Sequence, residues 1–262
     1  MATLNSTGVL YHDGTLVENS VTATRAIFGY GYTTNYQSLT NLVNNYGGVA
    51  TDTTGVGTAR EQLAATSYGG DKAIFGYGTT ATIFAITNLV SNLGVVAGDT
   101  AGVGTARRGL AAAGYGGDKA IFGYGTTGTN TSTTNLVSNT GVVATDTTGV
   151  GTARPSLAAA GYGGDKAIFG YGLVGLSASS ITNLVSNLGV VAGDTAGVGT
   201  ARRDLAAAGY GGDKAIFGYG RDTSGSIRYS ITNKVSNLGV VATDTIGIGT
   251  ARQSLAGASY SS

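Results

Sequence analysis

One phrase returns five times along this chain at an almost constant spacing, and this repetition constrains the fold more than any other feature. It reads Arg-Ala-Ile-Phe-Gly-Tyr-Gly at residue 25 and Lys-Ala-Ile-Phe-Gly-Tyr-Gly at residues 72, 119, 166 and 214, so three steps are 47 residues and the last is 48. The phrases Thr-Asn-Leu-Val-Ser-Asn and Gly-Thr-Ala-Arg follow the same period, with small changes. A fixed period in this range is typical of repeat architectures, in which each unit buries its apolar face only against its neighbours.

A single repeat contains four short apolar runs separated by turn residues. In the third copy the runs cover residues 110–115, 119–124, 134–138 and 142–145, and we refer to them as strands a, b, c and d. Glycine, asparagine and aspartate separate the runs, and no run keeps a helical period over the length that a helix needs. Four strands per repeat are the pattern of a propeller blade. We therefore expect an all-β fold, a five-bladed β-propeller with four antiparallel strands per blade.

The segment Arg-x-x-Leu-Ala-Ala-Ala-Gly-Tyr-Gly-Gly-Asp-Lys-Ala-Ile-Phe-Gly-Tyr-Gly resembles a kelch repeat. That family has an arginine before strand a, small residues in strand a, a glycine-containing turn, and a glycine pair at the end of strand b, which Tyr124 splits here. The resemblance covers residues 25–262 and implies a propeller. The repeats, rich in Gly, Thr and Ala, are also similar in style to those of bacteriophage tail and virion proteins, which implies a virion or extracellular location.

The order of the strands predicts how the ring closes. The first clear repeat begins with strand b at residues 26–31, and the last strand a lies at residues 255–260. We expect these two strands to pair, which would remove the free sheet edges and make residues 25–262 a single domain. Residues 1–24 are left over. They are a tail for attachment to other virion components, an extra strand such as residues 8–12, or a rival for the closing position.

Composition excludes several classes of protein. With 262 residues, of which 42% are hydrophobic, the chain can bury a sizeable core. A net charge of +1 gives no basic surface of the kind that nucleic acids need, so no nucleic-acid partner is expected. No apolar stretch reaches the length of a membrane span, so no membrane insertion is expected. The first residues show no signal peptide, and the absence of cysteine excludes disulfides.

The five copies differ mainly on one side of the expected ring. In an antiparallel blade the a–b and c–d turns lie on one side, and the b–c and d–a connections lie on the other. The a–b turn is constant and the c–d turn nearly so, whereas the b–c segments share almost nothing and the two residues after the repeat arginine also vary. Such variation fits a binding surface carried by loops on a rigid scaffold. The alternative is that long connections tolerate change better than tight glycine turns.

The aromatic, apolar and basic residues of the variable loops are the ones best suited to contact a partner. They are Tyr32, Tyr36, Ile83, Phe84, Leu173, Leu176, Arg221, Arg228 and Tyr229. We expect a non-enzymatic binding or adhesion module, associated with a phage virion or tail fibre, that recognises a host-surface glycan or protein. The alternatives are a lectin with five equivalent carbohydrate sites and a symmetric scaffold without a specific ligand.

Catalysis has few residues to draw on, and we expect no catalytic residue and no cofactor. The only histidine, His12, lies outside the repeats, and without cysteine neither a Ser-His nor a Cys-His pair can form in the ring. The repeated aspartates are either a fivefold metal or glycan site or a set of turn caps and Asp–Arg pairs; too few oxygen ligands accompany them for calcium, and no metal is expected. The tyrosines of strands a and b either stack on sugars or pack between blades.

Overall fold

The computed structural model describes residues 2–4, 10–12, 15–16, 26–44 and 46–259. Every regular element in these residues is a β-strand, and all strand pairs are antiparallel. Within the same ranges no helix has the length and apolar character needed to cross a membrane. The predicted all-β class with antiparallel repeat sheets is confirmed.

The strands form one sheet per repeat. The first sheet pairs β4 (Ala26–Tyr32) with β5 (Tyr36–Val43). Each of the next four sheets places strand b between strands a and c. The second sheet consists of β6 (Ala64–Tyr68), β7 (Lys72–Gly76) and β8 (Thr87–Val90), and the third consists of β9 (Ala111–Tyr115), β10 (Lys119–Gly123) and β11 (Thr134–Val137). The fourth sheet consists of β12 (Ala158–Tyr162), β13 (Lys166–Gly170) and β16 (Thr182–Val185), and the fifth consists of β17 (Ala206–Tyr210), β18 (Lys214–Gly218) and β19 (Thr232–Val235). A short hairpin of β14 (Leu173–Val174) and β15 (Ser177–Ala178) lies in the fourth b–c connection.

The fourth strand of each repeat is discontinuous, which corrects the prediction of a regular strand d. In the third sheet, segment d is joined to strand c by only two bridges, Thr134 to Thr147 and Val137 to Val143. Between them the Asn135 side chain donates hydrogen bonds to the carbonyl oxygen of Ala144 and to the carboxylate that follows it. A side chain therefore takes the place of part of the backbone ladder.

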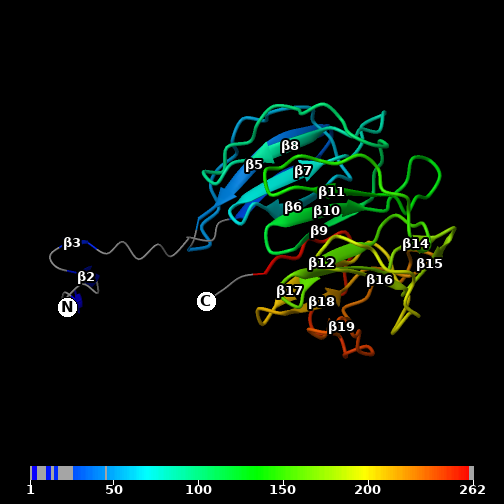
Figure 1. Cartoon of the computed structure of the whole chain (residues 1–262). Helices are drawn as coiled ribbons and strands as arrows, with labels where there is room; N and C mark the ends of the chain where they lie inside the picture. The colour runs from blue at the N-terminus through cyan, green and yellow to red at the C-terminus, as the bar shows by residue number, and fades with distance from the viewer. Residues whose placement is uncertain (1, 5–9, 13–14, 17–25, 45, 260–262) are drawn as a thin grey trace.

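Successive sheets stack face to face, and their a strands approach one another most closely, so the sheets spread like a fan (Figure 1). The Phe122 ring of one sheet lies on Gly76 of the sheet before it, where an added Cβ would be only 2.7 Å from the ring. Tyr77 packs against the same ring at a centroid distance of 5.2 Å. Phe75, Phe169 and Phe217 repeat this contact. Each glycine thus admits the phenylalanine that forms the core between two sheets.

The closed ring is not present in the described residues. Strand β4 has β5 as its partner there, and no second strand lies along its other edge. Residues 251–259 form no strand, and Gly257 lies against Ala206 and Ala207 of β17, one step further along the row of a strands. Within the described residues the fan therefore contains five sheets in series and is open, and the five-bladed closure remains a prediction.

Part of the N-terminal segment forms a small sheet of its own. Strand β2 (Leu10–His12) lies between β1 (Ala2–Leu4) and β3 (Thr15–Leu16). The extra strand expected at residues 8–12 corresponds in part to β2, which pairs with β1 and β3. The remainder of the 1–24 prediction falls on positions outside the described residues.

Candidate functional site

The arginine that ends each Gly-Thr-Ala-Arg phrase organises the contact between two sheets. Arg60, Arg107, Arg154 and Arg202 are fully buried. The Arg107 guanidinium lies over the Tyr77 ring of the preceding sheet at 4.2 Å. Its Nε donates to the Tyr124 carbonyl of the following sheet at 2.9 Å, and its Nη2 donates to Asn135 Oδ1 at 2.7 Å. Each buried arginine therefore joins two neighbouring sheets.

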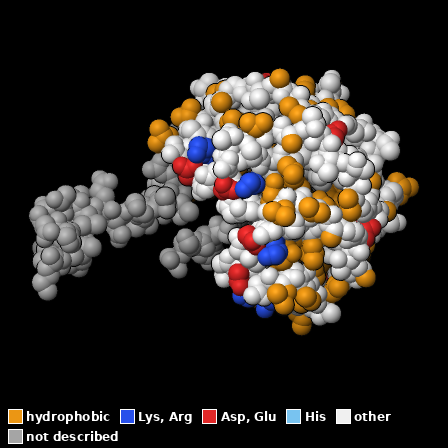
Figure 2. All heavy atoms as spheres, in the orientation of Figure 1, with side chains coloured by type: hydrophobic (Ala, Val, Ile, Leu, Met, Phe, Trp, Pro, Cys, Tyr) orange, Lys and Arg blue, Asp and Glu red, His pale blue; other side chains and the backbone are white. Residues whose placement is uncertain are grey.

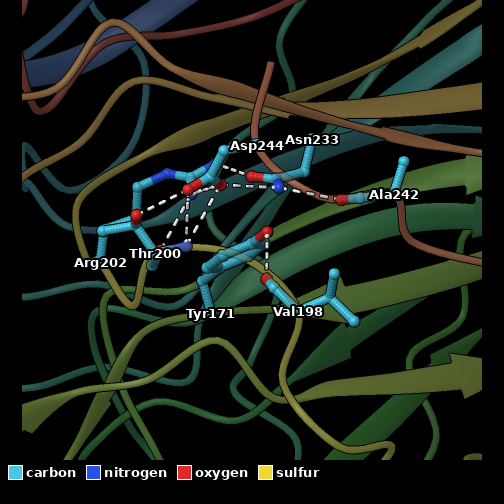
Figure 3. A network of polar contacts seen from close by, with 7 residues as sticks. All are labelled: Tyr171, Val198, Thr200, Arg202, Asn233, Ala242 and Asp244. Carbon is cyan, nitrogen blue, oxygen red and sulfur yellow. Dashed lines mark hydrogen bonds and ion pairs between the residues drawn. The ribbon is translucent and has the colours of Figure 1, made fainter. Parts of the chain in front are cut away.

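The aspartate of segment d completes this network, as Figure 3 shows for the last buried arginine. The Thr200 backbone N–H and hydroxyl donate to Asp244 Oδ2 at 3.0 and 2.6 Å, and Asn233 donates to its Oδ1 at 2.9 Å. Arg202 donates to Asn233 Oδ1 at 2.6 Å. Burial alone would raise the pKa of Asp244, but the hydrogen bonds from Thr200 and Asn233 outweigh it and hold the pKa below its usual value. The carboxylate is thus stabilised in its charged form.

The expected direct Asp–Arg pair is found at one sheet contact, between Asp244 and Arg202. The Asp244 carboxylate lies 3.9 Å from Arg202, and at the other sheet contacts the asparagine of strand c carries the connection between aspartate and arginine. The aspartates accept hydrogen bonds from the threonine of the neighbouring sheet, so they have the structural role that was one of the two interpretations of the repeated aspartates. Over the part of the chain that the structure describes, no group of three or more histidine, cysteine, aspartate or glutamate side chains lies close enough to hold a metal ion.

The tyrosines of strand b serve the same contact. Tyr30, Tyr77, Tyr124, Tyr171 and Tyr219 all have φ of 64° or 65°. This left-handed conformation costs a non-glycine residue about 1–2 kcal/mol. It turns the carbonyl toward the buried arginine, and the ring lies under the guanidinium of the next connection. Burial raises the pKa of Tyr124 to about 12, so its hydroxyl stays protonated and donates to the Val150 carbonyl at 3.1 Å. Packing between sheets, not an open aromatic platform, accounts for these rings.

The variable connections meet on one side of the fan. In four sheets the residue after the repeat arginine pairs through its backbone with the first residue of the b–c segment: Glu61 with Thr79, Arg108 with Thr126, Pro155 with Leu173, and Arg203 with Arg221. The following residues are linked from sheet to sheet, because the N–H groups of Gly109, Ser156, Asp204 and Ser254 each donate to the carbonyl of the preceding member, beginning at Gln62. A continuous backbone row therefore supports the positions that differ most between repeats.

The structure places the predicted contact residues on this variable side with different degrees of exposure. Leu176 is 89% exposed at the turn between β14 and β15, and Arg228 is also exposed. Tyr32 and Tyr36 are exposed and pack edge to face at 5.2 Å across one hairpin. Each of these four residues can reach a partner without rearrangement of the scaffold.

The other predicted residues are engaged within the protein. Ile83, Phe84, Leu173 and Tyr229 are half-buried, and the backbone of Tyr229 accepts a hydrogen bond from the N–H of the last repeat arginine. Arg221 donates through Nε to Asp204 Oδ2 at 2.7 Å, so its guanidinium braces a d–a connection. These five residues contribute shape to the variable side more than free contact groups.

Neighbouring b–c connections contact one another. Asn130 donates to the Leu173 carbonyl at 3.5 Å, and the Ala178 N–H donates to Thr223 Oγ1 at 2.9 Å. Between the second and third sheets a groove of about 380 Å³ is lined by residues that include Ile83, Arg108 and Thr127. The b–c connections of the second to fifth repeats therefore lie side by side.

The opposite side is regular. Each a–b turn carries an adjacent Asp–Lys ion pair, such as Asp118 with Lys119 at 2.8 Å, and the aspartate also accepts a hydrogen bond from the c–d turn, here from Asn139. Figure 2 shows these charges in a column beside a band of hydrophobic side chains. The c–d turns expose apolar tips that the sequence comparison passed over because they do not vary. They include Leu93, Val95, Val142, Leu188, Val190, Leu238 and Val240.

Comparison with known proteins assigns no family to this arrangement. No protein-family model matches the chain, and the search of curated proteins found no match.

Proposed function

We propose that this protein is a non-enzymatic binding module whose fan of sheets presents the variable b–c and d–a connections to a macromolecular partner. One observation carries the proposal: the positions that differ between repeats pair with one another on one side of the molecule, above a framework that is nearly identical in all repeats. Loops on a rigid scaffold are the usual location of such sites.

The buried framework favours this proposal over a lectin with five equivalent sites. Equivalent sites need constant residues, and the constant aspartates and strand-b tyrosines are occupied by hydrogen bonds and ring contacts between sheets. The proposed partner is a host-surface glycan or protein, and the proposed setting is a phage virion or tail fibre; this setting rests on the resemblance of the repeats. The role needs the loops side by side and does not depend on closure of the fan into a five-bladed propeller.

Two exposed leucines provide a matched test. Leu176 is 89% exposed on the variable side, and Leu188 is 78% exposed in a c–d turn. Binding of the purified protein to a glycan array and to bacterial cells should fall at least about tenfold for Leu176→Ser or Arg228→Ser, because central contacts dominate such interfaces. Leu188→Ser should bind like the parent. The proposal is wrong if Leu188→Ser loses binding and the variable-side variants keep it.

A further inference from the structure

The first and last sheets of the fan present the two halves of the contact that joins all the other sheets. At the first sheet, Phe28 is 53% exposed, although Phe122, Phe169 and Phe217 are fully buried at the same repeat position. At the last sheet, an added Cβ on Gly218 would meet only Thr232 within 4 Å, at 3.2 Å, whereas its equivalents Gly76, Gly123 and Gly170 each lie under a phenylalanine ring. One face offers a ring and the other offers the space that receives it.

The polar halves are complementary in the same way. Arg252 lies over the Tyr219 ring at 4.0 Å and donates from Nη1 to the Thr250 carbonyl, as the buried arginines do on their own side. It is exposed, because no following sheet lies beside it among the described residues. In the interior, the strand-b carbonyl of that sheet accepts from Nε of Arg60, Arg107 and Arg154. The strand-c asparagine accepts from Nη2 of all four buried arginines. These acceptors exist at the other end of the fan as the Tyr30 carbonyl and Asn41.

The first sheet holds its half in position. Asn41 donates to Asp52 Oδ1 at 2.9 Å and to the Ala50 carbonyl at 3.1 Å, the same bonds that orient Asn135 in the third sheet. Tyr30 has the same left-handed φ of 64° as Tyr124, whose carbonyl accepts the hydrogen bond from Arg107 Nε in the interior. The Asp52 carboxylate has the same repeat position as Asp146. In the interior, Asp146 accepts a hydrogen bond from Thr105, the threonine two residues before the arginine. An incoming Thr250 and Arg252 would therefore meet a preformed site.

The strand edges match as well. Residues 255–259 continue the row of a strands with no strand b beside them among the described residues, and β4 is a strand b whose free edge lacks a strand a. In the interior register, Ala112 pairs with Phe122 and Ala111 pairs with Gly123. The same register would pair Gly257 with Phe28 and Ala256 with Gly29.

We propose that two copies of this chain join head to tail, with β4 of one copy completing the sheet begun by residues 255–259 of the other. The contact is heterologous, because different surfaces of the two copies meet, so it can continue into rings or filaments. The variable connections of successive copies would then lie in series and bind with increased avidity, a consequence that rests on the proposed function.

The experiment blocks one face at a time. Phe28→Asp removes the ring from the first face, and Arg252→Glu places a carboxylate opposite Asp52 at the second. Because each variant keeps one intact face that finds no partner on its own copies, each should be monomeric alone by sedimentation velocity and light scattering. An equimolar mixture should form a dimer and nothing larger, whereas the parent chain should grow beyond the dimer as its concentration rises.

Two further variants keep the result interpretable. Gly218→Ala fills the space that Phe28 would occupy and requires little rearrangement of its own sheet. It should assemble as Arg252→Glu does, and it replaces that variant if circular dichroism shows that Arg252→Glu folds poorly. Leu176→Asp, on the variable side, should assemble like the parent. A parent chain that stays monomeric at every concentration, as closure between its own ends would make it, overturns the proposal. So does a mixture that fails to dimerise, or a parent dimer that both single-face variants retain.

Discussion

Arg154 and Arg252 have the same place in the repeat and very different surroundings. Arg154 is fully buried, lies over Tyr124, and donates from three nitrogens to Tyr171, Thr152 and Asn183. Arg252 is exposed and has a ring and one carbonyl from its own side. The difference shows that two adjacent sheets together form each contact. A repeat residue therefore contributes to the free energy of unfolding only where the next sheet is present.

The largest difference between interior and end should appear at the phenylalanines. Phe122→Ala removes a fully buried ring from the contact over Gly76 and should lower the free energy of unfolding by about 3–5 kcal/mol. Phe28→Ala removes a ring that is already half exposed and should cost about 1 kcal/mol. Urea denaturation at a concentration where the chain is monomeric measures both values. Equal losses at the two positions would contradict the open fan.

The arginines should differ by a smaller amount. Arg154→Ala leaves the Asn183 side chain and the Tyr171 carbonyl without their donor inside the protein, which should cost about 3 kcal/mol. Arg252→Ala leaves no buried acceptor without its hydrogen-bond donor, so it should change the free energy of unfolding by less than about 1 kcal/mol. The measurement is again urea denaturation of the dilute chain. A loss at Arg252 that matches the loss at Arg154 would mean that the last sheet is covered in solution.

The glycines under the rings give the sharpest matched pair, because the substitution adds one methyl group at equivalent positions. An added Cβ on Gly170 would lie 2.6 Å from Phe217, so Gly170→Ala should force the two sheets apart and lower the melting temperature, at a cost of about 1–3 kcal/mol. The Cβ added by Gly218→Ala meets only the Thr232 methyl group within 4 Å, at 3.2 Å. The free-energy cost should be a few tenths of the cost at Gly170, so the melting temperature of the dilute chain should change little. If Gly170→Ala is harmless, the ring contact does not set the sheet spacing.

The period and the turn residues were sufficient to predict the all-β class and the a, b and c strands of the repeats. The expected strands at residues 110–115, 119–124 and 134–138 correspond to β9, β10 and β11 within one residue at each end. Segment d was wrong as a regular strand because Asn135 replaces part of its ladder with side-chain bonds. The signal was present in the sequence as an asparagine at the second position of the strand-c phrase in every copy.

Other features could not be obtained from the sequence. The chain offers glycines on both sides of Tyr124, and they are the residues to which a positive φ would be assigned, yet Tyr124 itself adopts φ 64°. Closure could not be decided either, because it depends on the angle between sheets, which many small contacts set together. The side of the variable loops was predictable, since antiparallel pairing alone fixes it, whereas the ion pair that engages Arg221 with Asp204 depends on three-dimensional proximity.

Acid should affect the interior contacts through their aspartates. Hydrogen bonds from Thr105 and Asn135 outweigh the burial that would raise the pKa of Asp146, and they hold that pKa below its usual value. A folded pKa below the unfolded value of about 3.9 contributes stability that is complete above that pH and disappears as the pH falls through the folded pKa. The melting temperature should therefore be nearly constant from about pH 7 to pH 5 and fall below about pH 4.

Substitution of the equivalent aspartates, Asp146 in an interior contact and Asp52 in the first sheet, gives a further comparison between the interior and the end of the fan. Asp146→Asn turns an amide toward the Asn135 amide and weakens the bonds from Thr105, so it should lower the melting temperature at neutral pH and remove part of the fall below about pH 4. Asp52→Asn should lower the melting temperature of the dilute chain less, because Asn41 is its side-chain partner and no threonine from another sheet donates to it among the described residues. Melting curves recorded by circular dichroism across this pH range measure both changes. If Asp146→Asn melts like the parent at neutral pH and keeps the full acid response, the carboxylate does not hold the two sheets together. The contact then depends on the arginine and the aromatic rings alone.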